Sequence, residues 1–70
     1  MTYEEFVTEI KTAVAGCPKE LRRGQSTFNV VEERFHVAHL VQAKGIDCFY
    51  DDSKIGVFLR EAWGFVCKNS

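Results

Sequence analysis

The histidines and cysteines are the residues of this chain best suited to metal binding or nucleophilic chemistry. His36 and His39 stand three residues apart, so their imidazoles would share one face of a helix. Together with Cys48 and Cys67 they would supply the four ligands of a Cys₂His₂ zinc site. The two cysteines are isolated in the sequence, however, whereas zinc sites usually draw them from close pairs. The sequence therefore predicts ordinary histidines and small buried thiols, with no bound metal and no cofactor.

Three aspartates lie close together, at Asp47, Asp51 and Asp52. Clustered carboxylates are ligands that Mg²⁺ and Ca²⁺ prefer, but the spacing is not that of an EF-hand loop and no glutamate closes the site. A carboxylate just before an apolar helix more often accepts hydrogen bonds from the free N–H groups of the first turn. We therefore expect Asp51 or Asp52 to cap the last helix.

A cysteine beside a histidine can also serve as a catalytic nucleophile. The chain has three cysteines and two histidines, but it contains no nucleophile elbow, phosphate-binding loop or HExxH motif. A bundle of short helices also leaves little room for a substrate pocket of about 300 Å³ or more. We therefore predict that the protein is not an enzyme and has no catalytic residues.

A polar face is expected where Arg22, Gln25 and Asn29 follow one another at steps of three and four residues. On a helix these steps align the three side chains, beside Gly24. One hypothesis is that they recognise a partner or a phosphate group. The other is that they bind the backbone and acidic groups of the fold itself, which is the commoner use of polar side chains.

The structural hypothesis makes a specific prediction about the loop at residues 47–52. The polar face would hold this loop against the helix, Gly24 would allow close approach, and the rings of Phe49 and Tyr50 would be buried as anchors. Replacing Asn29 by alanine would then lower the stability by about 1–3 kcal/mol, because a buried backbone group would lose its partner. We favour this hypothesis over recognition. The candidate interaction or motif residues are Arg22, Gln25, Asn29, Phe49, Tyr50, Asp51 and Asp52.

The same residues carry a resemblance to a group of short bacterial and phage-associated proteins of unknown function. That group has a helix with the pattern RxGQxxxN, then a short helix, a DPFYDD-like loop and a final helix. The matching residues are Arg22, Gly24, Gln25, Asn29, Asp47, Phe49, Tyr50, Asp51 and Asp52. Cys48 stands where the pattern has proline, so a less rigid loop is expected. The resemblance covers just over half of the chain and implies a phage or mobile-element origin, but no particular activity.

Four amphipathic segments would position these residues in an all-α bundle of about four short helices. The first begins at a capping box formed by Thr2 and Glu5 and ends at Gly16 and Pro18. The second and third are either separate or one continuous helix with a kink at residues 35–36. The expected helices cover residues 2–15, 18 or 19 to 35, 37–44 and 53–67, with a loop at 46–50.

The apolar positions of these helices predict one shared core. In the second helix they include Gly24, where another helix, the last one, or the loop at residues 47–52 would approach closely because glycine has no side chain to hold it away. The expected core residues are Phe6, Ile10, Leu21, Phe28, Val31, Leu40, Phe58, Leu59, Ala62 and Trp63.

The composition describes one helical domain, residues 1–70, with 46% hydrophobic and 13% aromatic residues and a net charge of −1. A domain this small and this aromatic has more apolar surface than one core hides, so the leading prediction is a protein-interaction module that binds a protein partner or associates with itself. The alternative is a small helix-turn-helix-like DNA-binding regulator. The DNA-binding alternative is based on four cations within 16 residues, namely Lys19, Arg22, Arg23 and Arg34. Glutamates lie between these cations and reduce the local positive charge.

The cellular compartment is inferred from the cysteines and from the start of the sequence. Cys17, Cys48 and Cys67 have no CxxC spacing, and their odd number fits poorly with a disulfide framework. The acidic start, MTYEEFVTEI, does not resemble a signal peptide, and no apolar run reaches the ~18 residues of a membrane span. We therefore expect a cytoplasmic protein with reduced thiols and no membrane partner.

Overall fold

Four α-helices and one short 3₁₀ helix make up residues 1–68, the part of the chain that the computed structural model describes. Their bounds are Tyr3–Ala15 for α1, Arg23–Phe35 for α2, Ala38–Ala43 for α3, Asp52–Lys54 for the 3₁₀ helix η1 and Ile55–Lys68 for α4. Within these residues there is no strand, so the prediction of a small all-α bundle is confirmed. None of the helices in this part of the chain combines the length and the apolar character that crossing a membrane requires.

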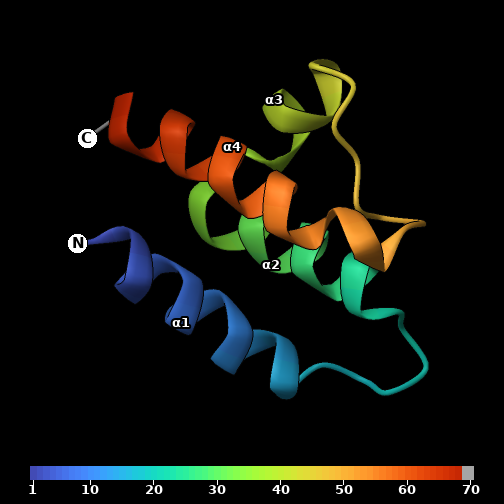
Figure 1. The fold of residues 1–70 in the computed structure, drawn as a ribbon. Helices are drawn as coiled ribbons and strands as arrows, with labels where there is room; N and C mark the ends of the chain where they lie inside the picture. The colour runs from blue at the N-terminus through green and yellow to red at the C-terminus, as the bar shows by residue number, and fades with distance from the viewer. Residues whose placement is uncertain (69–70) are drawn as a thin grey trace.

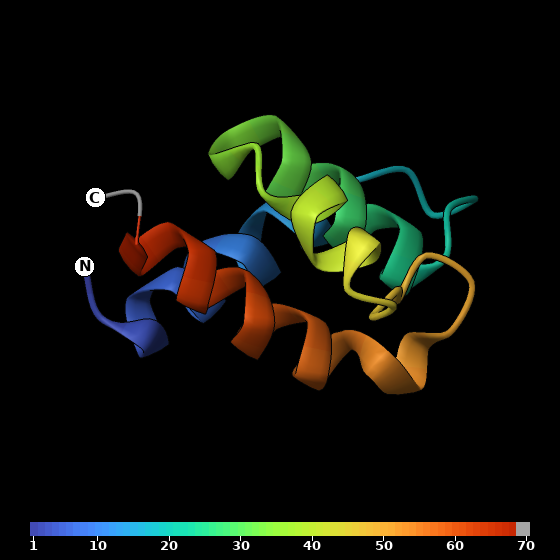
Figure 2. The same cartoon turned by 90° about the horizontal axis from the view of Figure 1, so that it is seen from above.

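The helices are arranged around α2. In Figure 1, α1 and α4 run in opposite directions in front of α2, and α3 lies on the side of α4 away from α1. Figure 2 shows the same bundle from above, with the beginning of α1 and the end of α4 at the same end of the molecule. The rings of Tyr3 and Trp63 pack at that end, with their centroids 6.2 Å apart.

The first helix begins at the predicted capping box. Thr2 Oγ1 accepts a hydrogen bond from the backbone N–H of Glu5 at 3.2 Å, and Glu5 Oε1 accepts one from the N–H of Thr2 at 2.7 Å. The hydrogen bond from the backbone N–H of Thr2 holds the pKa of the Glu5 carboxyl below its ordinary value, because it favours the charged carboxylate. Phe6 and Ile10 on the apolar face of α1 have no exposed surface. The cap of α1 and its buried face are therefore both determined by the local sequence, as predicted.

The second helix begins at Arg23, later than the predicted start at residue 18 or 19. Residues 18–21 form a turn instead, in which the backbone N–H of Leu21 donates to the carbonyl oxygen of Pro18 at 3.2 Å. Arg22 is extended, with φ −67° and ψ 152°, so the helix starts after it. The predicted start was wrong because the cap of α2 comes from a distant segment, which the local sequence does not show.

The second and third helices are separate. His36 adopts a left-handed conformation with φ 58°, which ends α2, and the chain turns before α3 begins at Ala38. One continuous kinked helix is therefore excluded. α3 is also shorter than the predicted residues 37–44, and Gly45 follows it with φ 89°, where glycine avoids the strain of a side chain.

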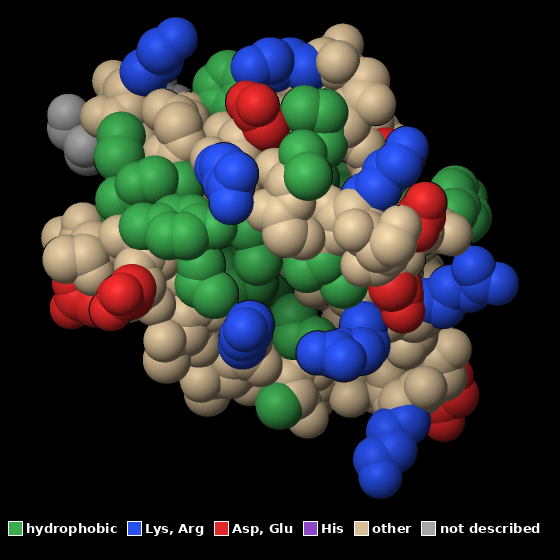
Figure 3. Space-filling model, in the orientation of Figure 1, with side chains coloured by type: hydrophobic (Ala, Val, Ile, Leu, Met, Phe, Trp, Pro, Cys, Tyr) green, Lys and Arg blue, Asp and Glu red, His purple; other side chains and the backbone are tan. Residues whose placement is uncertain are grey.

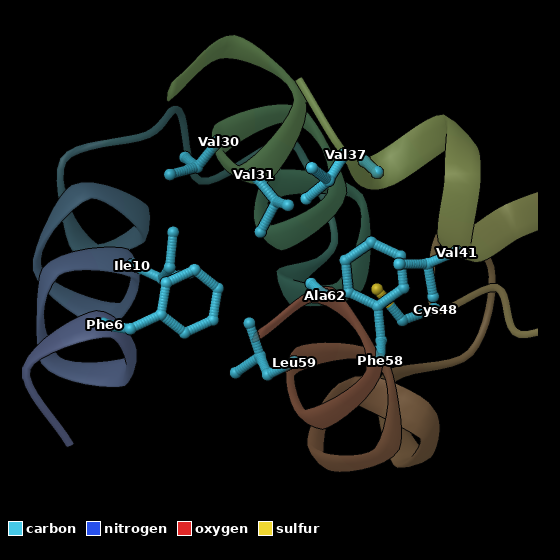
Figure 4. Close-up of a cluster of buried hydrophobic side chains, with 11 residues drawn as sticks. Phe6, Ile10, Val30, Val31, Val37, Val41, Cys48, Phe58, Leu59 and Ala62 are labelled. Carbon is cyan, nitrogen blue, oxygen red and sulfur yellow. The ribbon is translucent and has the colours of Figure 1, made fainter. Parts of the chain in front are cut away.

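The core collects side chains from all four α-helices and from the loop before η1. Figure 4 shows Phe6 and Ile10 on one side of it and Phe58, Val41 and Cys48 on the other. Six expected core residues are buried, namely Phe6, Ile10, Val31, Phe58, Leu59 and Ala62. The other four, Leu21, Phe28, Leu40 and Trp63, are half-buried, and the last three of them pack against the core.

Three residues of α2 are buried although the predicted core omitted them. Ser26, Thr27 and Val30 are all less than a tenth exposed, because α2 has neighbours on more than one side and its buried stripe is correspondingly wide. The hydroxyl of Thr27 donates to the carbonyl oxygen of Arg23 at 2.8 Å, so its burial does not leave it without a hydrogen bond.

Candidate functional site

The loop before η1 meets α2 at Gly24. A Cβ atom at this position would collide with the carbonyl oxygen of Cys48, so only glycine allows the contact. The thiol of Cys48 donates to the carbonyl oxygen of Gly24 at 3.3 Å, and Asp52 Oδ1 accepts from the N–H of Gly24 at 2.9 Å. We call this set of contacts the Gly24 clamp. The predicted close approach at Gly24 is confirmed, and its partner is the loop.

Further hydrogen bonds hold the loop, one from Arg22 just before α2 and two between Asp51 and Ser53. Arg22 Nη1 donates to the carbonyl oxygen of Tyr50 at 3.2 Å, as the structural hypothesis expected. Asp51 Oδ1 accepts from the hydroxyl and the N–H of Ser53, at 2.6 and 3.0 Å, and these bonds hold the pKa of Asp51 below its ordinary value. Both aspartates therefore cap helices: Asp51 caps η1 and Asp52 caps α2.

Gln25 and Asn29 do not take part in holding the loop. Among residues 1–68, neither side chain forms a hydrogen bond, and Asn29 is exposed while Gln25 is half-buried. The hypothesis that the whole polar face secures the loop was therefore wrong for these two residues. The backbone N–H and carbonyl groups of Gly24 hold the loop in place of these two side chains.

The aromatic residues of the loop also behave differently from each other. Phe49 is half-buried and packs edge-on against Phe28, with their centroids 5.6 Å apart. Tyr50 packs on Phe49 at 4.8 Å but is 75% exposed, so the prediction that both rings are buried was wrong for Tyr50. One ring anchors the loop, and the other rests on it facing solvent.

The histidines and cysteines of the hypothetical zinc set lie in different environments. His36 and His39 are exposed, Cys48 is fully buried, and Cys67 is exposed on α4. The Nδ1 atom of His39 lies 2.9 Å from Glu32 Oε1, and this contact holds the pKa of Glu32 below its ordinary value. Within residues 1–68 no three His, Cys, Asp or Glu side chains form a group that could hold a metal ion.

A groove between α1 and α4 is the feature that sequence reasoning missed. It has a volume of about 430 Å³ near the beginning of α1 and about 340 Å³ near its end, so the expectation that short helices leave little room for a hollow of this size was wrong. Its apolar lining includes Val7, Ile10, Val14, Ile55 and Leu59. Figure 3 shows hydrophobic side chains gathered over α4 and α1, with Lys and Arg side chains beside them. We call this feature the α1–α4 groove.

The charge of the groove comes from three side chains, Lys11, Arg23 and Asp52. Asp52 accepts the hydrogen bond from Gly24 described above. Among residues 1–68, neither Lys11 nor Arg23 forms an ion pair, whereas other cations do, with pairs at Arg34–Glu9 and Lys44–Glu61. The groove therefore presents two cations without anionic partners beside an apolar floor.

A second hollow, of about 580 Å³, lies between α1 and α2. Its lining includes Glu9, Glu33, Arg34 and Cys17, and Arg34 Nη1 contacts Glu9 Oε1 at 3.5 Å. It differs from the α1–α4 groove in that its one cation, Arg34, is already paired with Glu9. Because that cation is not free to pair with a ligand, this hollow is the weaker candidate for a binding surface.

Comparison of the chain with models of known protein families, with curated proteins and with solved structures finds no match. The resemblance to short phage-associated proteins stays a prediction.

We expect Gly24→Ala to lower the free energy of unfolding by about 1–3 kcal/mol, because the new methyl group must push the Cys48 carbonyl away from α2. The control is Gly64→Ala in α4, where a Cβ atom meets nothing within 4 Å. There the loss of glycine from a helix should raise stability by about 1 kcal/mol. Urea denaturation measures both. Equal effects of the two substitutions would contradict the clamp.

Asp52→Ala should lower the stability by about 1 kcal/mol, because the N–H of Gly24 would lose its acceptor at the start of α2. Asn29→Ala should change it by less than about 0.5 kcal/mol, since this exposed side chain holds no loop group. Thermal unfolding of the two variants compares them directly. A larger loss for Asn29→Ala would restore the original hypothesis about the polar face.

The Cys48 thiol should resist alkylation in the folded protein. Burial raises its pKa to about 12, so the reactive thiolate is scarce at neutral pH. In a Cys17→Ser, Cys67→Ser variant, mass spectrometry should show iodoacetamide modifying Cys48 only as fast as the chain opens, with urea as the control that restores rapid reaction. Rapid alkylation without urea would contradict this account.

The same raised pKa makes the stability of the protein depend on pH. Because an unfolded thiol has a pKa of about 8.5, the stability that the protonated Cys48 thiol contributes is present below that pH and is lost as pH rises toward the folded value.

Proposed function

We propose that this chain is a non-enzymatic protein-interaction module of the cytoplasm, of phage or mobile-element origin, and that it binds its partner in the α1–α4 groove. The observation that supports the proposal is the open apolar lining of that groove. Tyr3, Val7 and Ile55 stay half-buried there, although the core beneath them is closed. Apolar surface in contact with water favours association, because a partner removes it from water.

The chemistry of the buried thiol supports a role outside catalysis. Cys48 is enclosed by the core, and its raised pKa keeps it protonated at neutral pH. A protonated, inaccessible thiol is a poor nucleophile. Its hydrogen bond to Gly24 gives it a structural use instead.

A DNA-binding regulator is the competing proposal, and it would use α2 and α3 as a helix-turn-helix. α3 has only six residues, AHLVQA, and none of them is Lys or Arg. Recognition helices usually carry positive side chains toward the phosphates that flank the major groove. The interaction module predicts no salt-dependent retention of the protein on DNA, which affinity chromatography over a salt gradient tests.

Gly56→Trp should block the groove. Gly56 lines it, and a Cβ atom added there meets nothing within 4 Å, so a large side chain can start at this position and reach over the groove. Gly64→Trp is the matched control, because this glycine lies on the same helix, has equally open surroundings and does not line the groove. Peptides selected from a displayed random library against the natural protein should bind the control normally and the blocked variant at least about tenfold more weakly.

Two results would contradict the assignment of the groove. One is a set of selected peptides that binds the Gly56→Trp and natural proteins equally well. The other is a selection that enriches no binder at all. Circular dichroism of both tryptophan variants serves as the check that each is folded before its binding is compared.

A further inference from the structure

The shape of the α1–α4 groove indicates what kind of segment it can hold. The hollows near its two ends share Lys11, Arg23, Ile55 and Leu59, so they form one continuous groove along α1. Because α1 has 13 residues, the groove is about 20 Å long, which matches between three and four turns of a partner helix. Apolar anchors at helical spacing can therefore fill it along its whole length.

The walls of the groove favour a helix over an extended peptide. An extended peptide usually binds by adding a strand to a sheet edge, where free backbone groups pair with it. Both walls here are α-helices, whose backbone groups are bonded within each helix, and residues 1–68 contain no sheet. A partner must therefore satisfy its own backbone hydrogen bonds, which a helix does.

The charge of the groove selects among helices. Lys11 and Arg23 stand at the groove without ion pairs among residues 1–68, and Asp52, the third charged side chain, accepts the N–H of Gly24. A partner with carboxylates beside its apolar face would pair with these cations, whereas a basic partner would be repelled. The groove therefore carries a positive local charge, whereas the net charge of the whole chain is −1.

We propose that the α1–α4 groove binds an amphipathic helix of a partner protein whose apolar face is flanked by glutamates or aspartates. This inference rests on the proposed function and adds the chemical class of the partner. The two cations would choose the partner and orient it, while the half-buried side chains of Ile55, Val7 and Val14 would supply the apolar contact.

The test uses two fluorescent synthetic helical peptides with the same leucine anchors, one carrying glutamates and the other lysines at the flanking positions. At low salt the natural protein should bind the glutamate peptide at least about tenfold more tightly by fluorescence anisotropy, and the preference should shrink as salt screens it. Lys11→Glu should abolish the preference. The control Lys19→Glu, an exposed position outside the groove, should leave it within about twofold.

Each alternative result has a defined meaning. Equal affinity for the two peptides, a preference for the lysine peptide, no saturable binding, or a preference that survives Lys11→Glu would overturn the acidic-helix inference. The proposed function survives such a result if the library peptides still depend on the open groove at Gly56, and it fails if they do not. Sedimentation of the protein alone identifies the case in which a second copy fills the groove, which would also overturn the inference.

Discussion

The close contact between Gly24 and the loop before η1 is the constraint on which the rest of the structure depends. Only a residue without a side chain lets the Cys48 carbonyl reach α2, and the same approach brings Asp52 to the N–H of Gly24. These contacts determine where α4 begins, because the loop has no regular structure of its own. α4 must begin there for the ring of Phe58 to pack against Phe28, at 5.6 Å. A steric requirement at one glycine thus positions the helix that forms one wall of the α1–α4 groove.

Two helices are capped by carboxylates from outside their own first turns. Arg22 and Val37 precede α2 and α3, and neither provides a side-chain cap. Instead Asp52 accepts the N–H of the second residue of α2, and Glu32 accepts the N–H of His39, the second residue of α3, at 3.0 Å. A carboxylate satisfies a free N–H at a helix start and matches the positive end of the helix dipole. The start of α2 therefore depends on η1, and the start of α3 depends on α2.

Sequence reasoning succeeded where the cause of a structure is local. The capping box at Thr2, the cap at Asp51 and the spacing of apolar residues predicted the helices and six of the eleven buried apolar residues among residues 1–68. It failed where the cause is distant, because α2 starts where Asp52 can reach it. It placed the end of α2 correctly at residue 35, but it left open whether α2 and α3 are separate, since a left-handed His36 and not a glycine divides them. Gly24 was recognised as a point of close approach, but the groove was not, because its width depends on how α1 and α4 pack on α2.

The Gly24 clamp also determines the charge that the groove presents. Asp52 is the one acidic residue that lines the groove within residues 1–68, and its carboxylate accepts a hydrogen bond at the positive N-terminus of α2. That helix end compensates the negative charge in part, so Lys11 and Arg23 dominate the field over the apolar floor. Without the clamp the carboxylate would be available to those two cations and would weaken their attraction for an acidic partner. The Asp52 side chain thus takes part both in the contact that positions α4 and in the charge that would select a partner.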